Sequence, residues 1–179
     1  DDLSKLHCKW LVSNFKNVSY LNVNLDNVFS SFENALGENN SEHAFANSRA
    51  RLRMTTLYQV AGSNNGIVVG TGNKVEDFGV GFYTKYGDGG VDISPIADCT
   101  KSQVWEMGEF LEIDHKIISA PPTDGLWVDG RNDEDQLGMT YKELEEAMEN
   151  PKSENYNKYL KIRENNLHKI KEIPVCKFD

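Results

Sequence analysis

The sequence predicts an α/β domain, because helical and extended patterns alternate along the chain. Two segments carry apolar residues at helical spacing, and the run "IVVG" at 67–70 is short, apolar and β-branched, like a buried strand of a parallel sheet. Thr100 with Gln103 and Thr140 with Glu143 match the helix capping box, so a helix is expected to begin after each threonine.

The expected elements follow in order from the N-terminus. Residues 3–11 carry the apolar spacing of a helix, and "VSYLNVNL" at 18–25 alternates like a strand. After the polar loop "GENNSE", a longer helix covers 45–61, and "NNG" ends it before the strand at 67–70. The two capped helices contain "VWEMGEFL" and "LEEAM". No repeat or convincing linker interrupts this order, so we expect one domain over residues 1–179.

Composition limits the partners and the compartment. The net charge is −9, from 19 basic and 28 acidic residues, which disfavours nucleic acid and anionic membranes as partners. Three cysteines lie far apart and form no CxxC pair, and we find neither a signal peptide nor a long apolar run. These features favour a cytoplasmic protein.

The strand at 67–70 leads into "GTG", which begins like a dinucleotide-binding fingerprint. Val75 stands where the third glycine of that fingerprint belongs, so a plain turn from strand to loop explains Gly70 and Gly72 better. A different phosphate-binding turn at the end of this strand remains open.

The segment "TKYGDGGVD" at 84–92 has almost nothing that could fill a core. Its glycines permit unusual backbone conformations and close approach of a ligand. Lys85 can neutralise a phosphate or carboxylate, while Asp88 and Asp92 can accept hydrogen bonds or approach a cation. From these residues alone, a solvated turn remains the simpler interpretation.

Two further charged segments leave alternatives open. In "NSRARLRM" at 47–54, three arginines on neighbouring helix faces suit either a phosphate or carboxylate in a pocket, or surface ion pairs. In "DGRNDEDQLG" at 129–138, both possible calcium-loop registers place a wrong residue at a ligand position, so surface acidity or an acid-lined wall of a site is favoured.

Several segments together closely resemble NAD synthetase, an N-type ATP pyrophosphatase. They are "ARLRMTTLY", "VVGTGNKVE", "TKYGDGGVDISPI", "TKSQV", "PPTDGLWVDGRNDEDQLGMTYKELEEAM" and "LHKIKEIPVCKF", and the resemblance runs from about Asp1 to Asp179. It implies a Rossmann-like, doubly wound parallel sheet of the adenine nucleotide alpha hydrolase-like type, incomplete at the N-terminus. It also implies that ATP adenylates the carboxylate of deamido-NAD and that ammonia then displaces AMP to give NAD, with Mg²⁺ assisting, in a homodimer.

Matching positions carry the family's roles onto this sequence. The resemblance implies ATP contacts at Thr71, Lys101 and Thr123. It implies a magnesium carboxylate at Glu76. It implies deamido-NAD contacts at Arg51, Lys85, Asp92, His168 and Lys169. The residues expected to take part in catalysis are Lys101, Asp88, His168 and Lys169.

Lys101 also stands out by its position at the start of a helix. The backbone N–H groups there already favour an anion, so a lysine does not help the helix itself. We therefore expect a phosphate between the helix start and the Lys101 ammonium, in agreement with the resemblance.

The sequence departs from the family pattern in one important respect. N-type ATP pyrophosphatases grip ATP with an SGGxDS loop after their first strand, and this sequence contains no such loop. We therefore interpret the chain as the larger C-terminal part of one domain, or as a record without its N-terminal residues, and expect it to be inactive alone. The alternatives are another amide-forming enzyme, such as a GMP synthetase, or a non-catalytic fragment that binds a dinucleotide.

Overall fold

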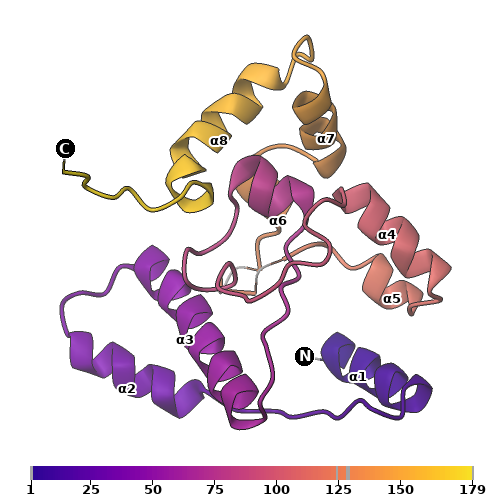
Figure 1. Ribbon diagram of the computed structural model, residues 1–179, viewed down its shortest axis with the longest axis vertical. Helices are drawn as coiled ribbons and strands as arrows, with labels where there is room; N and C mark the ends of the chain where they lie inside the picture. The colour runs from indigo at the N-terminus through magenta and orange to yellow at the C-terminus, as the bar shows by residue number, and fades with distance from the viewer. Residues whose placement is uncertain (1, 124, 128–129, 179) are drawn as a thin grey trace.

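A computed structural model describes residues 2–123, 125–127 and 130–178, and the elements in these ranges are helices (Figure 1). The α-helices are α1 Asp2–Asn14, α2 Asp26–Leu36, α3 Glu42–Ser63, α4 Lys101–Phe110, α5 His115–Ile118, α6 Asp133–Leu137, α7 Tyr141–Glu149 and α8 Tyr156–Ile170. A π-helix, η1, spans Lys74–Val80. Long irregular segments join these elements, above all between η1 and α4.

The prediction of an α/β fold with a Rossmann-like, doubly wound parallel sheet is wrong, because the described residues form no sheet. The expected strand at 67–70 makes only one isolated parallel bridge, between Val69 and Ile93. Backbone hydrogen bonds join Gly70 N to Ile93 O at 2.8 Å and Asp92 N to Val68 O at 2.9 Å. The side chain of Val69 is 54% exposed. An apolar β-branched run suits a strand, but the ladder also needs neighbours that the local pattern does not reveal.

The expected strand at 18–25 is also wrong, since this segment is irregular and carries no strand pairing. Tyr20, Leu21 and Val23 are all exposed, so the alternation does not separate a buried face from a solvated one. Helix α2, which follows directly, was not predicted.

The expected helices are confirmed. Helix α1 contains the first apolar series, and α3 contains the second and begins after Ser41, whose side chain accepts a hydrogen bond from Ala44 N. Both capping boxes are present, at the starts of α4 and α7. These signals depend on contacts within one turn of helix, which is why the sequence reveals them.

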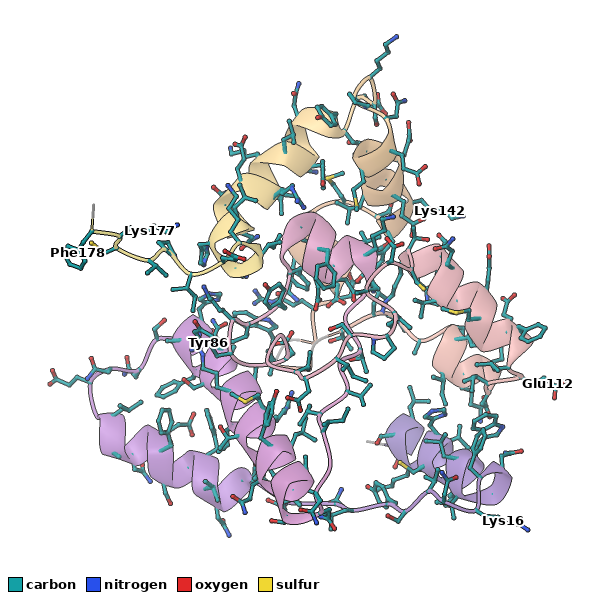
Figure 2. All side chains as sticks on the ribbon, in the orientation of Figure 1. Lys16, Tyr86, Glu112, Lys142, Lys177 and Phe178 are labelled. Carbon is teal, nitrogen blue, oxygen red and sulfur yellow. The ribbon has the colours of Figure 1, made fainter. Side chains whose placement is uncertain are left out.

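The core lies where η1, α7 and α8 pack together, with α6 beside them. Its buried side chains are Val75, Val80, Leu137, Met139, Tyr141, Leu144, Ala147 and Tyr159. Figure 1 shows α7 and α8 at one end of the molecule and the α2–α3 pair at the other. The C-terminal tail runs out into solvent, where Phe178 is 94% exposed (Figure 2). No helix in the described ranges is long and apolar enough to span a membrane.

Candidate active site

The π-helix η1 carries the most strongly charged part of the candidate site. Asn73 caps it, because its buried side chain accepts hydrogen bonds from Val75 N at 3.0 Å and Glu76 N at 3.1 Å. Gly81 ends it with φ of +67°, a conformation that favours glycine. π-helical turns are frequent at functional sites. Here the π-helix places the carboxylates of two consecutive residues, Glu76 and Asp77, on the wall of one cavity.

That cavity has a volume of about 350 Å³ and gathers residues that lie far apart in the sequence. Five of the residues that the sequence analysis assigned to ATP, magnesium or catalysis line it: Thr71, Glu76, Asp88, Lys101 and Thr123. Gly72, Asp77, Phe82, Pro122 and Asp133 complete the lining. The cavity therefore combines hydroxyl groups, carboxylates and one ammonium.

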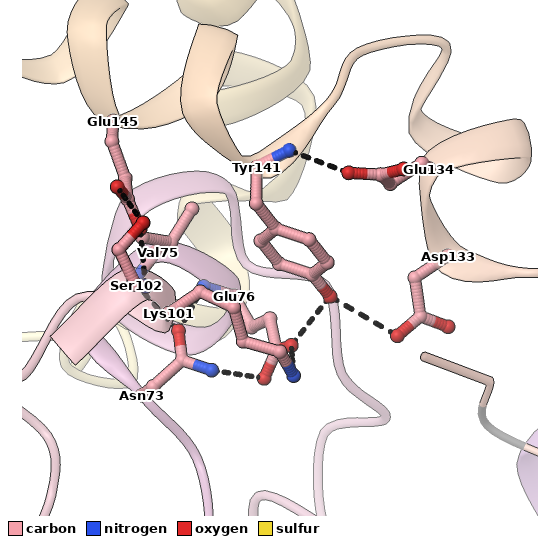
Figure 3. A network of polar contacts seen from close by, with 9 residues as sticks. All are labelled: Asn73, Val75, Glu76, Lys101, Ser102, Asp133, Glu134, Tyr141 and Glu145. Carbon is pink, nitrogen blue, oxygen red and sulfur yellow. Dashed lines mark hydrogen bonds and ion pairs between the residues drawn. The ribbon is translucent and has the colours of Figure 1, made fainter. Parts of the chain in front are cut away.

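The Glu76 carboxylate lies at the centre of a hydrogen-bonded network (Figure 3). Its Oε1 accepts from Lys101 Nζ at 2.8 Å and from the Tyr141 hydroxyl at 2.5 Å, while its Oε2 accepts from Asn73 Nδ2 at 2.5 Å. The Tyr141 hydroxyl also lies 3.1 Å from Asp133 Oδ2. Only 17% of the Lys101 side chain and 15% of the Glu76 side chain are exposed, so this ion pair is largely shielded from water.

The charged and polar donors at the start of α4 are paired with carboxylates of the protein itself. Lys101 pairs with Glu76, and its Nζ also lies 4.8 Å from the centroid of the Tyr141 ring. Ser102 donates its backbone N–H and its hydroxyl to the carboxylate of Glu145, at 2.8 Å and 2.7 Å. The anions at this helix start are the carboxylates of Glu76 and Glu145. The phosphate expected there stays a prediction.

Asp77 is partly buried beside other acidic groups. Burial raises the pKa of its carboxyl to about 7, and the nearby charges of Asp88 and Glu76 add to this, while Lys169 opposes it. The chain passes very close to Asp77, because a Cβ at Gly72 would lie 1.9 Å from Asp77 Oδ2. Gly72 therefore leaves room for a carboxyl group.

The loop at 84–90 packs against the C-terminal end of α8. Lys85 Nζ donates to the His168 carbonyl at 2.8 Å, and the Tyr83 hydroxyl donates to the Lys169 carbonyl at 2.6 Å. Arg51 Nε reaches the backbone of the same loop, 3.2 Å from the Lys85 carbonyl. The first two bonds satisfy carbonyls of the last turn of α8, which have no helical partner.

Lys169 joins the two parts of the site. Its Nζ donates to the Gly81 carbonyl at 2.9 Å, and burial lowers the pKa of its ammonium although Asp88 and Asp77 oppose this. Lys169 lines a smaller cavity, of about 110 Å³, whose wall it shares with His43, Asn47, Thr84 and Trp127 among others. Asp88 and Phe82 line both this cavity and the larger one, so the two cavities are neighbours.

Four expected substrate contacts line neither cavity: Arg51, Lys85, Asp92 and His168. His168 is exposed in the last turn of α8. Asp92 accepts from Val68 N at 2.7 Å and from the Tyr58 hydroxyl at 3.2 Å, so it holds the segment 67–70 against α3. Their assigned roles stay predictions.

A family model described as NAD synthase matches residues 1–176. This chain belongs to the NAD synthase family. Among curated relatives, it is 44% identical over 139 residues to "NH(3)-dependent NAD(+) synthetase" of Carboxydothermus hydrogenoformans, a match that covers 75% of this chain and 56% of that protein. It is 36% identical over 189 residues to the protein of the same name from Methanosarcina acetivorans, covering 96% of this chain and 71% of that one.

Solved structures agree with this family. The match to NMN synthetase from Francisella tularensis has a TM-score of 0.85 at 28% identity and covers 98% of this chain and 74% of that one. The match to NH3-dependent NAD synthetase from Campylobacter jejuni has a TM-score of 0.67 at 21% identity and covers 90% and 67%, so it supports the fold alone. The NAD synthase chain described here spans just over half the length of the first curated relatives that it matches, 56% and 57%.

Magnesium is the metal that the NAD synthase family implies, and the donor types in the larger cavity fit it. Mg²⁺ takes oxygen ligands, keeps several waters, and is usually held by one or two carboxylates together with substrate phosphates. The carboxylates of Glu76 and Asp77 and the hydroxyls of Thr71 and Thr123 are such ligands. Within the described ranges, no group of three or more histidine, cysteine or acidic side chains is arranged to hold a metal. Oε1 of Glu76 already accepts from Lys101 and Tyr141, so an ion bound to this oxygen would replace at least one of these donors.

Sequence reasoning missed three residues that shape this candidate site, Asn73, Asp77 and Tyr141, and did not single out Asp133 within its acidic segment. Asn73 carried a usable signal, because an asparagine followed three residues later by a glutamate resembles a helix start. Asp133 fits the interpretation of an acid-lined wall of a site, since it is buried and lines the larger cavity. Nothing local points to Tyr141, which meets Glu76 across 65 positions. Asp129, the first residue of one calcium-loop register, lies outside the described residues.

Proposed function

We propose that this chain is part of one NAD synthetase domain that amidates deamido-NAD with ammonia, ATP and Mg²⁺, and that it releases AMP and pyrophosphate. One observation carries the proposal: Thr71, Glu76, Asp88, Lys101 and Thr123 line one cavity, although they are spread over more than 50 positions. Family membership supports the same chemistry.

Lys101 and Glu76 form the part of the cavity that ATP would change most. The Lys101 ammonium leaves the Glu76 carboxylate and donates to the phosphates, where a positive charge stabilises the charge that develops on the departing pyrophosphate. Glu76 is then available as the carboxylate for Mg²⁺. Bound Mg²⁺ would neutralise phosphate charge. Thr71 and Thr123 supply hydroxyl donors to the same nucleotide.

The neighbouring cavity supplies the groups for the second substrate. Asp88 lies on the wall between the two cavities, so it can hold an amine or hydroxyl group beside the reacting carboxylate. Lys169 offers a positive charge on the other side of this wall, and we propose that it and His168 close over the bound substrates. Arg51, Lys85 and Asp92 contact the dinucleotide after the loop at 84–90 rearranges.

A second candidate is the same amidation on a mononucleotide, which gives NMN. The structural match at a TM-score of 0.85 is to a protein titled NMN synthetase, and this observation favours keeping the candidate. The reacting carboxylate and the ATP chemistry are shared, so the two candidates differ in the size of the second substrate.

We also propose that the protein acts as a homodimer through α3. This helix has 22 residues, and Leu57 in its C-terminal half is 56% exposed. Single exposed apolar residues are common on protein surfaces, so this proposal rests on the homodimer that the family resemblance implies, and Leu57 is the position at which it is tested.

The test compares this chain with the longest open reading frame that contains it, called the full-length protein below. Each is incubated with ATP, Mg²⁺ and ammonia, and with deamido-NAD or its mononucleotide counterpart, and products are separated by chromatography. We expect NAD from the full-length protein and no turnover from this chain alone. Absence of both NAD and NMN would refute the proposal, and turnover by this chain alone would refute the need for an SGGxDS loop.

Lys101→Met in the full-length protein tests the assigned role of the ammonium. Losing a charge-assisted hydrogen bond should cost about 1.5–3 kcal/mol, which is on the order of a ten- to hundredfold loss of the ATP-dependent rate constant. Because Lys101 also holds Glu76, a thermal melt without nucleotide is measured alongside. Lys142→Met is the control, since this lysine is exposed on α7. Unchanged ATP kinetics would remove Lys101 from the proposed machinery.

A further inference from the structure

Tyr141 holds its hydroxyl group in a fixed place next to the larger cavity. It begins α7, only 1% of it is exposed, and its ring packs edge-on against Trp105 with centroids 5.9 Å apart. Its neighbours in the core are Val75, Leu144 and other buried apolar side chains. A tyrosine packed in this way has little freedom to move its hydroxyl group.

The hydroxyl of Tyr141 lies between two carboxylates. It is 2.5 Å from Glu76 Oε1 and 3.1 Å from Asp133 Oδ2. A phenol has one hydrogen and can donate it to one acceptor at a time, and the shorter distance marks Glu76 as that acceptor. A tyrosine hydroxyl is protonated at neutral pH, so it acts as the donor in this contact.

The donors around Glu76 differ in how firmly they are held. Lys101 reaches Oε1 at the end of a flexible four-carbon stem, and the proposed function assigns its ammonium to phosphate. Asn73 holds the other oxygen, Oε2. When Lys101 moves, the Tyr141 hydroxyl is the donor that stays on Oε1 (Figure 3).

We propose that Tyr141 is a positioning residue, which keeps the Glu76 carboxylate turned toward the cavity while Lys101 exchanges Glu76 for a phosphate. This inference rests on the proposed function, because that function makes Glu76 the carboxylate for Mg²⁺. When Oε1 meets a cation, the single hydroxyl hydrogen can turn to Asp133, which lies on its other side. Tyr141 thus holds Glu76 in place until the cation arrives, and then leaves Oε1 to the cation.

The experiment measures how Mg²⁺ affects the melting temperature of the full-length protein in the presence of ATP. Tyr141→Phe keeps the ring and removes the hydroxyl. Tyr159→Phe is the matched control, because Tyr159 belongs to the same core and is 7% exposed. We expect the Mg²⁺ concentration at the midpoint of the stabilisation to rise about tenfold in Tyr141→Phe, as for other residues that orient a metal ligand. Tyr159→Phe should leave the midpoint unchanged.

Three outcomes would overturn the inference. An unchanged midpoint in Tyr141→Phe, in a wild-type protein that responds to Mg²⁺, would show that the hydroxyl does not position Glu76. An equal shift in Tyr159→Phe would reduce the effect to general loosening of the core. A wild-type protein that does not respond to Mg²⁺ with ATP would refute the proposed function and, with it, the role of Tyr141.

A second measurement tests the contact without any ligand. Tyr141→Phe, Glu76→Leu and the double variant of this chain are unfolded in urea, since leucine offers no acceptor to the hydroxyl. If the hydroxyl holds the carboxylate, the double variant should lose less stability than the sum of the two single variants, since both changes act on the same hydrogen bond. Additive losses would overturn the proposed contact, whatever the metal titration shows.

Discussion

Among single residues, Asp77 should make the stability of the chain depend on pH. Its pKa is about 7 in the folded state against 3.8 for the free side chain, so the folded state binds its proton more tightly than the unfolded state. The free energy of unfolding should therefore fall as the pH rises from about 4 to about 7. Asp77→Asn removes this loss. The free energy of unfolding of the variant, measured relative to wild type, should therefore be higher at pH 8 than at pH 5 by about 2 kcal/mol.

Urea unfolding of this chain at both pH values, without Mg²⁺, checks the effect of Asp77. Glu109→Gln serves as a control for an exposed carboxylate on α4. If the free energy of unfolding changes by the same amount between pH 5 and pH 8 in wild type and in Asp77→Asn, Asp77 is not protonated in the folded chain near neutrality.

Residue types were predictable from the sequence, whereas their partners were not. The sequence indicates that Lys101 should meet an anion, and the structure supplies Glu76, 25 positions earlier. Gly72 was interpreted as a turn glycine, but its closest constraint is the Asp77 carboxyl. Contacts of this kind depend on how distant segments pack, so a local pattern cannot specify them. The same holds for Asp92, whose carboxylate holds Val68 and Tyr58 in this structure.

Among secondary-structure elements, η1 should depend on Arg163 of α8. The Arg163 guanidinium donates to the carbonyls of Phe78 and Gly79, at the end of the π-helix where carbonyls lack helical partners. Arg163→Met keeps most of the stem and removes these donors. It should lower the free energy of unfolding by about 1–3 kcal/mol, because the carbonyls of Phe78 and of the buried Gly79 lose a charged partner.

Lys161→Met, an exposed position on the same helix, is the control for Arg163→Met. Both variants of this chain are compared with wild type by urea unfolding. A loss in Arg163→Met no larger than that in Lys161→Met would show that the guanidinium does not stabilise η1.

Elements with local signals were predicted correctly, and those that need distant partners were not. The capping boxes of α4 and α7 lie within one helical turn, and both are present. The segments 18–25 and 67–70 have the composition of strands, but strands are stabilised by pairing, and the described residues provide one bridge. The π-helix was not expected either, since it depends on Asn73 at one end and on α8 at the other.

At the scale of the whole molecule, family membership was predictable and the architecture was not. Short motifs such as "TKYGDGG" carried the resemblance to NAD synthase, and the family model confirms it. The motifs carry no information on how many strands pair around them. The larger cavity forms nevertheless, because η1, the start of α4 and the region of α6 and α7 are held together by the core and by the Glu76 network.

The surface of the whole chain predicts self-association. Its accessible area is 12659 Å², whereas a compact monomer of 20.2 kDa should expose about 8,800 Å². Large apolar side chains contribute to this surface, among them Leu57 on α3, Val69 in the segment 67–70 and Phe110 on α4. We therefore expect this chain to bind the dye ANS and to have a mass above 20.2 kDa in light scattering at micromolar concentration.

If α3 is the dimer contact, Leu57→Lys should lower that mass toward the monomer, whereas Phe110→Lys on α4 should not. A monodisperse monomer that binds no ANS would contradict the prediction, and equal effects of the two lysine variants would mean that association is not specific to α3.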